Sequence, residues 1–195
     1  MDKLVRNFIA KSQIIDPSIC DEILEETKDL NWVKHTWYSH HDKIEHSHDE
    51  KEPDVLHGAD VPDTTQEKLI MHINAMYKNY VAFLEKDLGY DQLNMIKYWS
   101  PCRINRYPTG SLMRRHYDHI HSLFDGTSRG IPVISVVGCL TDSKDYDGGE
   151  IVFFDDLSIK LEKGDILIFP SCFLYPHGVE EITRGERHTF VSWGF

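Results

Sequence analysis

The second half of the chain alternates short apolar runs with turn signals, and this rhythm limits the possible folds more than any other feature. The runs IPVISVVGCL at 131–140, IVFF at 151–154 and DILIF at 165–169 have the length and composition of strands. Glycine-containing turns separate them, DGG at 147–149 and KGD at 163–165. Because no crossover helix interrupts the series, we expect the strands to pair antiparallel, as a sandwich or a jelly roll.

The first half carries a helical period instead. Apolar residues at three- and four-residue steps predict a helix over 64–88, and Gly89 supplies its stop. The residues that set this period are Leu69, Ile70, Ile73, Met76, Tyr77, Tyr80, Val81 and Leu84. An earlier helix is expected to begin at Asp16 and Pro17, since aspartate caps a helix and proline suits its first position. Both helices should support the sheet.

Composition indicates one ordinary globular domain. Hydrophobic residues make up 41% of the 195 positions and charged residues 27%, which excludes the class of disordered chains. No internal repeat or low-complexity tract divides the sequence. We therefore expect a single α+β domain over 1–195, with 1–91 as a mostly helical buttress and 92–195 as the β core.

The charge balance disfavours nucleic acid as a partner. The formal net charge is −11, so the overall field repels phosphate backbones. A local basic groove stays open as an alternative, because four arginines cluster along the sequence. They are Arg103, Arg106, Arg114 and Arg115.

Cysteine usage and hydropathy predict a cytoplasmic protein without a membrane partner. The four cysteines are widely spaced, which is typical of reduced thiols and not of a disulfide scaffold. They are Cys20, Cys102, Cys139 and Cys172. Polar residues interrupt the segment after Met1, and no run of about 18 apolar residues occurs.

Residues 39–54 are almost wholly polar, and we interpret them as a solvated loop. A metal site is the alternative, since four histidines lie there. They are His40, His41, His46 and His48. The loop is favoured because these histidines lack a regular backbone to hold them.

A histidine and a carboxylate stand two positions apart at His116 and Asp118, next to an expected strand. In extended backbone such residues point to one face, so both can reach one metal. His177, which follows the apolar strand ending at Phe169, is a candidate for a second imidazole. Two imidazoles and one carboxylate leave adjacent positions open, which suits non-haem iron(II). A hydrolytic zinc with the same ligands remains possible on this evidence.

Arg187 comes ten residues after His177 and opens an alternating run. Arg187, Thr189, Val191 and Trp193 should share one face of a strand. If that face is buried, the guanidinium needs an anion, and its planar fork fits a carboxylate. The alternative is a surface arginine in a salt bridge.

The ordered set His116-x-Asp118, His177 and Arg187 resembles the 2-oxoglutarate and iron(II)-dependent dioxygenases, most closely the prolyl 4-hydroxylase-like group. The resemblance covers about residues 92–195. The further motifs that agree are Tyr107 in an R-Y-x-x-G context, GGE at 148–150, K-G-D-x-L-x-F at 163–169, and Trp193 six residues after the arginine.

The resemblance implies a double-stranded β-helix core of the jelly-roll or cupin-like kind. It implies iron(II) held by the two histidines and Asp118 as the catalytic centre. It further implies 2-oxoglutarate bound by Arg187 and Tyr107, with Trp193 also on the cofactor-binding surface. O2 would be the second co-substrate, and ascorbate is a candidate auxiliary reductant.

The implied activity is 2-oxoglutarate- and O2-dependent hydroxylation, with a prolyl residue of a peptide or protein as the leading substrate. A free amino acid or another small molecule is an alternative. An AlkB-like nucleic-acid dealkylase is a second one, because Asn105, Tyr107 and Gly110 also resemble that family, although Trp193 stands where it has arginine. A non-catalytic metal-binding β-domain is the third.

The polar, glycine-bearing residues 119–130 follow the metal motif directly and are interpreted as a candidate lid. Within it, Arg129 could contact a substrate. An ordinary surface loop is the alternative.

Overall fold

The computed structural model describes residues 5–39, 44–46, 50–89, 95–118 and 132–195. The helices are α2 (Pro17–Thr27), the 3-10 turn η1 (Gly58–Asp60) and α3 (Asp63–Leu88). The strands of the first half are β1 (Ala10–Gln13), β2 (Val33–Lys34), β3 (Trp37–Ser39), β4 (Ile44–His46) and β5 (Asp54–Leu56). Those of the second half are β6 (Arg103–Pro108), β7 (Met113–His116), β8 (Ile134–Cys139), β9 (Tyr146–Asp147), β10 (Ile151–Phe153), β11 (Leu157–Ile159), β12 (Asp165–Pro170), β13 (His177–Val179) and β14 (Arg184–Gly194).

Two antiparallel sheets form the centre of the fold. The larger sheet runs β1-β12-β8-β14-β6-β5-β2, with β9 paired to β14, and the smaller runs β11-β10-β13-β7. Apolar side chains pack between them: the rings of Phe153 on β10 and Phe169 on β12 meet edge to face at 4.9 Å. The predicted double-stranded β-helix with supporting helices is confirmed. Strands β1, β2 and β5 of the first half also pair within the larger sheet.

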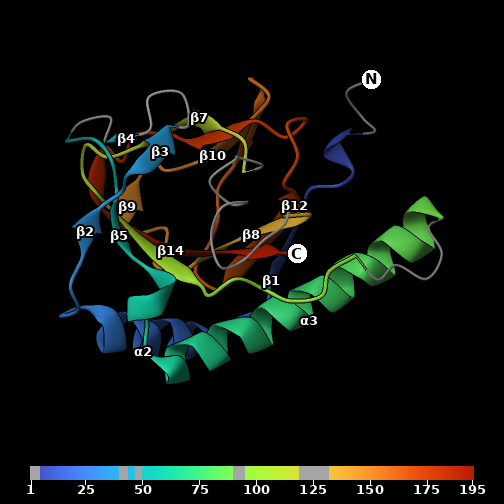
Figure 1. The fold of residues 1–195 in the computed structure, drawn as a ribbon, viewed down its shortest axis with the longest axis horizontal. Coiled ribbons are helices and arrows are strands. Elements are labelled where there is room, and N and C mark those ends of the chain that lie inside the picture. Colours follow the sequence, from blue (N-terminus) through green and yellow to red (C-terminus); the bar gives the residue numbers. More distant parts are fainter. Residues whose placement is uncertain (1–4, 40–43, 47–49, 90–94, 119–131) are drawn as a thin grey trace.

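The helices cover the outer face of the larger sheet (Figure 1). The alternation of β12 shows how one strand serves both layers, because successive side chains point to opposite faces. Ile166 and Ile168 belong to the core beneath the helices, whereas Leu167 and Phe169 belong to the core between the sheets.

Both predicted helices are confirmed. In α2, the Asp16 side chain accepts a hydrogen bond from the backbone N–H of Ser18 at 2.9 Å, and Pro17 stands at the first helical position. At the end of α3, Gly89 adopts a left-handed φ of 72° and its N–H donates to the carbonyl of Leu84. This is the glycine C-cap that the sequence indicated.

The interpretation of residues 39–54 as a solvated loop is wrong in part. Strand β3 pairs with β4, and β5 begins at Asp54 and joins β6 in the larger sheet. Glu52 is only 2% exposed and lies 2.9 Å from His35 Nδ1. These strands are only three residues long, which is too short for a hydrophobicity pattern to reveal them. Their formation depends on pairing partners more than on local preference.

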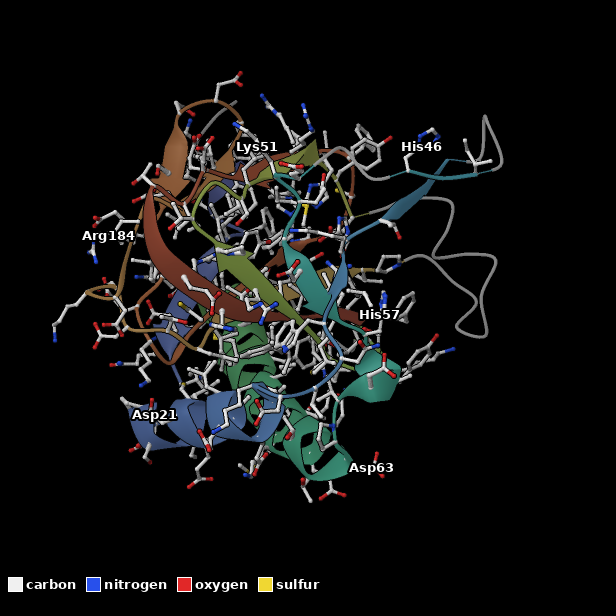
Figure 2. All side chains as sticks on the ribbon, turned by 90° about the vertical axis from the view of Figure 1, so that its left-hand side faces the viewer. Asp21, His46, Lys51, His57, Asp63 and Arg184 are labelled. Carbon is white, nitrogen blue, oxygen red and sulfur yellow. The ribbon has the colours of Figure 1, made fainter. Side chains whose placement is uncertain are left out.

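Of the four histidines in that segment, His46 lies on β4, at the edge of the molecule (Figure 2). Outside the described residues lie His40, His41, His48 and the whole predicted lid at 119–130, with Arg129. None of the helices in the described ranges is long and apolar enough to cross a membrane. All four cysteines are free thiols, as predicted.

The close pairing of β8 with β14 leads to a prediction about stability. Gly138 lies directly opposite Phe190, and a Cβ at position 138 would come within 2.0 Å of that ring. We expect Gly138→Ala to lower the free energy of unfolding by about 1–3 kcal/mol, as overpacking does. In a Phe190→Leu background the same change should cost less, which urea denaturation of the four proteins would measure. Equal costs in both backgrounds would contradict this contact.

Candidate metal centre

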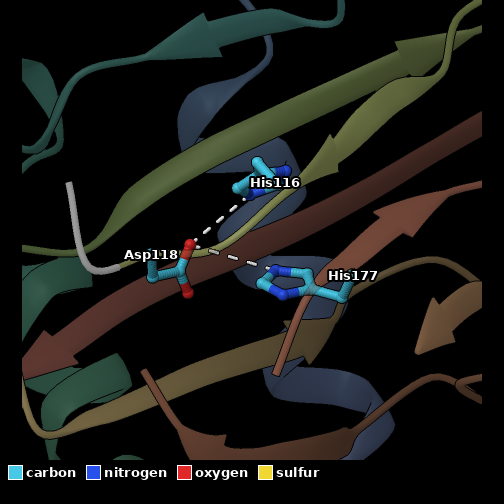
Figure 3. A group of neighbouring side chains, drawn as sticks. All are labelled: His116, Asp118 and His177. Carbon is cyan, nitrogen blue, oxygen red and sulfur yellow. Dashed lines mark ion pairs between the residues drawn. The ribbon is translucent and has the colours of Figure 1, made fainter. Parts of the chain in front are cut away.

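Cross-strand pairing in the smaller sheet brings two histidines together. His116 ends β7, His177 begins β13, and the two residues are direct partners in the antiparallel register. Their ring centroids lie 4.5 Å apart. One ligand atom from each of these histidines and one from Asp118 all lie within 4.8 Å of one another (Figure 3).

Asp118 lies just past the end of β7, yet its carboxylate turns into the same cavity. Its Oδ1 is 3.4 Å from Nε2 of His116 and 3.9 Å from Nε2 of His177. Its Oδ2 accepts a 2.5 Å hydrogen bond from the hydroxyl of Ser135, which lies 2.7 Å from the Ser171 hydroxyl. One carboxylate oxygen is thus fixed by the larger sheet while the other faces the histidines.

Backbone carbonyls fix the orientation of both imidazoles. Nδ1 of His116 lies 2.8 Å from the carbonyl of Arg114, and Nδ1 of His177 lies 3.1 Å from that of Tyr175. Since a carbonyl only accepts, each Nδ1 carries the proton and the Nε2 lone pair is directed at the site. The edge-on ring of Phe169, 4.8 Å from His177, holds that imidazole from the side.

The pKa shifts of the three side chains favour the binding of a cation. Burial raises the pKa of Asp118, but His177, His116 and the Ser135 hydrogen bond outweigh it, so the pKa falls well below its usual range. Burial lowers the pKa of His177 below its ordinary value. Burial also lowers the pKa of His116, but the hydrogen bond to Asp118, the charge of that carboxylate and the Arg114 carbonyl together outweigh it, so the pKa of His116 is raised. A metal ion would therefore replace a proton beside an ionised carboxylate.

Arg187 occupies another wall of the cavity, on β14. It is 1% exposed, and its Nε and Nη2 have no hydrogen-bond partner among the described residues. Its guanidinium lies over the ring of Tyr107, 5.6 Å from the centroid, because the two residues are paired across β14 and β6. Gly149 makes the room: a Cβ there would come within 2.9 Å of Cδ of Arg187. The second glycine of the G-G-E motif is therefore explained by the space that the Arg187 side chain needs.

The residues singled out from the sequence line one cavity. It holds about 470 Å³ of empty space when the open mouth is included. The metal triad, Tyr107, Arg187, Thr189, Val191 and Trp193 all line it. The predicted common face of β14 is therefore directed into the cavity.

Sequence reasoning did not assign three neighbours to the site: it named Arg103 only in a basic cluster and Asn105 only in the AlkB-like resemblance, and it missed Ser135. Arg103 and Asn105 line the same cavity, and Ser135 holds Asp118. The period of two could have found the first pair, since they lie on β6 at even spacing from Tyr107. Ser135 offered no signal beyond one hydroxyl in an apolar run.

The donor set fits the groups that the resemblance implies. Two imidazole nitrogens and one carboxylate oxygen converge from one side, which suits iron(II) with open positions opposite. The guanidinium of Arg187 is buried, and its Nε and Nη2 lack a partner among the described residues, so it calls for an anion. A carboxylate of 2-oxoglutarate matches its planar fork. A closed structural zinc site would instead need a fourth protein ligand.

The chain is similar to known hydroxylases over its second half. Residues 102–195 match the profile of the 2OG-Fe(II) oxygenase superfamily. A PKHD-type hydroxylase of Methylobacterium nodulans is 35% identical over 97 residues, which cover 48% of this chain and 42% of the relative. One from Prochlorococcus marinus is 39% identical over 89 residues, covering 44% and 38%. The match thus spans about two fifths of the length of these relatives.

Solved structures share the whole fold. A prolyl hydroxylase of Trichoplax adhaerens, in complex with a hypoxia inducible factor oxygen degradation domain peptide fragment, superposes with a TM-score of 0.66 and 17% identity, covering 100% of this chain and 86% of that one. A Pseudomonas putida prolyl-4-hydroxylase gives a TM-score of 0.62 and 17% identity, covering 99% and 95%. With this fold, the matched profile and the assembled motif, residues 102–195 of the chain belong to the 2-oxoglutarate and iron(II)-dependent oxygenase superfamily.

Proposed function

We propose that this chain is a 2-oxoglutarate- and O2-dependent hydroxylase whose substrate is a prolyl residue in a peptide or protein. One observation carries the proposal: a His-Asp-His group and the buried guanidinium of Arg187, with two nitrogens that lack a partner among the described residues, line a single cavity. In this proposal His116, Asp118 and His177 hold iron(II), and Arg187 holds the far carboxylate of 2-oxoglutarate. The activity belongs to a single cytoplasmic domain over 1–195, which the shared helix–sheet core and the free cysteines support.

Bound iron(II) would supply the redox chemistry, in which O2, 2-oxoglutarate and a substrate C–H group give succinate, CO2 and a C–OH group. The protein's part is orientation and the exclusion of water. Arg187 and the Tyr107 ring beneath it fix one end of the keto acid. Carbonyl-bound Nδ1 atoms keep both histidine Nε2 lone pairs directed at the metal, and Ser135 keeps one oxygen of Asp118 away from it.

The cavity walls suit an apolar ring such as that of proline. Between the charged groups the lining is aliphatic, with Met113, Val137, Val179 and Val191 among its members. Two of the structurally similar proteins are prolyl hydroxylases, one of them with a peptide bound. Nucleic acid fits less well, because the chain carries a net charge of −11.

Loss of a proposed metal ligand should abolish turnover. With Asp118→Ala we expect iron-dependent succinate release to fall below detection, because two neutral imidazoles alone hold iron(II) poorly. Asp155→Ala is the matched control, since that carboxylate is 86% exposed and only pairs with Arg115. Succinate assays would measure both, and mass spectrometry of a proline peptide library would seek the gain of one oxygen. Equal succinate release by the two variants would refute the assignment.

Loss of the buried guanidinium should weaken co-substrate binding. Arg187→Ala is expected to raise the KM for 2-oxoglutarate at least about tenfold, as loss of a charge-assisted pair does, with a smaller change in kcat. Arg184→Ala serves as control. Arg184 begins the same strand, β14, but its guanidinium is exposed and pairs with Asp147 of β9. An unchanged KM in Arg187→Ala would show that the co-substrate binds elsewhere.

The hydroxyl that positions Asp118 should tune iron affinity. Ser135→Ala removes the 2.5 Å hydrogen bond to Oδ2, and such outer contacts usually contribute about 10–100-fold to metal affinity. We expect a loss of that order in anaerobic titrations with iron(II). Ser158→Ala, at an exposed position of β11, should leave the affinity unchanged. The idea fails if both serine variants bind iron(II) alike.

A further inference from the structure

A second guanidinium faces the cavity, and neither the metal centre nor the 2-oxoglutarate site uses it. Arg103 begins β6 and lies on the strand face that also carries Asn105 and Tyr107. We propose that Arg103 is the residue that selects the substrate, by binding a carboxylate that the substrate carries near the oxidised carbon. This inference rests on the proposed hydroxylase function.

Among the described residues, the side-chain donors of Arg103 have no hydrogen-bond partner. Its Nε is buried without a hydrogen-bond partner, and the guanidinium forms no ion pair with a described residue. Its guanidinium carbon lies over the indole of Trp193, 5.4 Å from the ring centroid. The indole therefore covers one face of the guanidinium, and the in-plane N–H groups are left to bind a ligand.

Charges nearby compensate Arg103 only in part. Burial lowers the pKa of Arg103, and the opposing influence of Tyr107, Asp118 and Glu52 does not restore it. Glu52 instead lies 2.9 Å from His35 Nδ1. Burying the charge of Arg103 without a full counter-charge lowers the stability of the free protein, and a bound anion would compensate that charge.

The backbones of Arg103 and Arg187 lie at different positions along the paired strands β6 and β14. Across β6 and β14, Arg187 pairs with Tyr107 whereas Arg103 pairs with Val191. Four residues of strand therefore separate the two positions, roughly 13 Å. Each guanidinium also lies over an aromatic ring: that of Arg187 over Tyr107, and that of Arg103 over Trp193. One small dicarboxylate fixed at Arg187 leaves Arg103 for a second molecule.

A carboxylate is the group that best fits this second position. A guanidinium binds a planar carboxylate through two parallel N–H···O contacts, and stacking on an indole leaves that geometry free. A neutral carbonyl would accept the same hydrogen bonds but would leave the charge uncompensated. We therefore expect acidic peptides, or a substrate with its own terminal carboxylate, to be preferred over their amides.

The same strand offers a matched control. Arg106 also stacks on an indole, with its guanidinium carbon 4.8 Å from the Trp32 ring centroid. It lies on the opposite face of β6 and already pairs with Asp54 at 2.9 Å. Arg103→Gln and Arg106→Gln thus remove equivalent groups, one directed into the cavity and one away from it.

The test measures binding with ligand pairs that differ only in carboxylate against amide. The pairs are L-proline and L-prolinamide, and blocked peptides containing Pro-Glu or Pro-Gln, and Glu-Pro or Gln-Pro. Calorimetric titration uses the zinc-loaded protein saturated with 2-oxoglutarate, so that no turnover occurs. In at least one pair, the wild type and Arg106→Gln should bind the carboxylate member about tenfold or more tightly than the amide. Arg103→Gln should bind both alike.

Two results would overturn the inference. One is the absence of any carboxylate preference in the wild type. The other is a loss of 2-oxoglutarate affinity in Arg103→Gln as large as in Arg187→Ala, which would assign Arg103 to the co-substrate. Binding of 2-oxoglutarate to the iron(II) protein, followed by absorbance, separates this from failure of the proposed function: if the wild type does not bind it, the hydroxylase proposal itself fails.

Discussion

The register between β7 and β13 is the constraint on which the site depends. It places His116 directly opposite His177, although 61 positions separate them in the sequence. Gly178 allows this approach, because a Cβ there would come within 2.9 Å of the carbonyl of Met113. A shift of one residue would turn His177 to the other face of the sheet and remove it from the cavity.

The larger sheet supplies the remaining groups of the site. Its β6 and β14 carry the guanidinium groups and the aromatic rings, while β8 supplies the serine that holds Asp118. Burying these charges between two sheets is unfavourable for the free protein, since Arg187 has donors with no partner in the described fold. The helices bear none of these groups. They cover the outer face of the sheet and so hold rigid the strands that carry the site.

Local patterns in the sequence were enough for part of this structure. The helix over Asp63–Leu88 follows from its own period and its glycine stop, and the common face of Arg187 and Trp193 follows from strand alternation. The pairing of His177 with His116 did not follow from any local pattern. The place of His177 after an apolar strand made it a candidate ligand, but its register with His116 is a long-range contact that the fold sets.

Other features of the structure could not be predicted from the sequence, because they depend on which strands pair in the folded protein. Strands β3 and β4 have three residues each, and Glu52 is buried within a segment whose composition is mostly polar. Arg103 looked like one member of a basic cluster, yet the period of two separates it from Arg106 onto the opposite face of β6. Composition and clustering report on averages, whereas the direction of a side chain depends on the pleat of its strand.

The central claim is that one iron(II) ion lies between His116, Asp118 and His177 with a carboxylate of 2-oxoglutarate on Arg187. Anaerobic crystals grown with both ligands, with diffraction recorded at the iron absorption edge, would test it most directly. We predict one anomalous peak within bonding distance of the three side chains, and co-substrate density that reaches the guanidinium. An iron peak elsewhere, or 2-oxoglutarate bound away from Arg187, would contradict the claim.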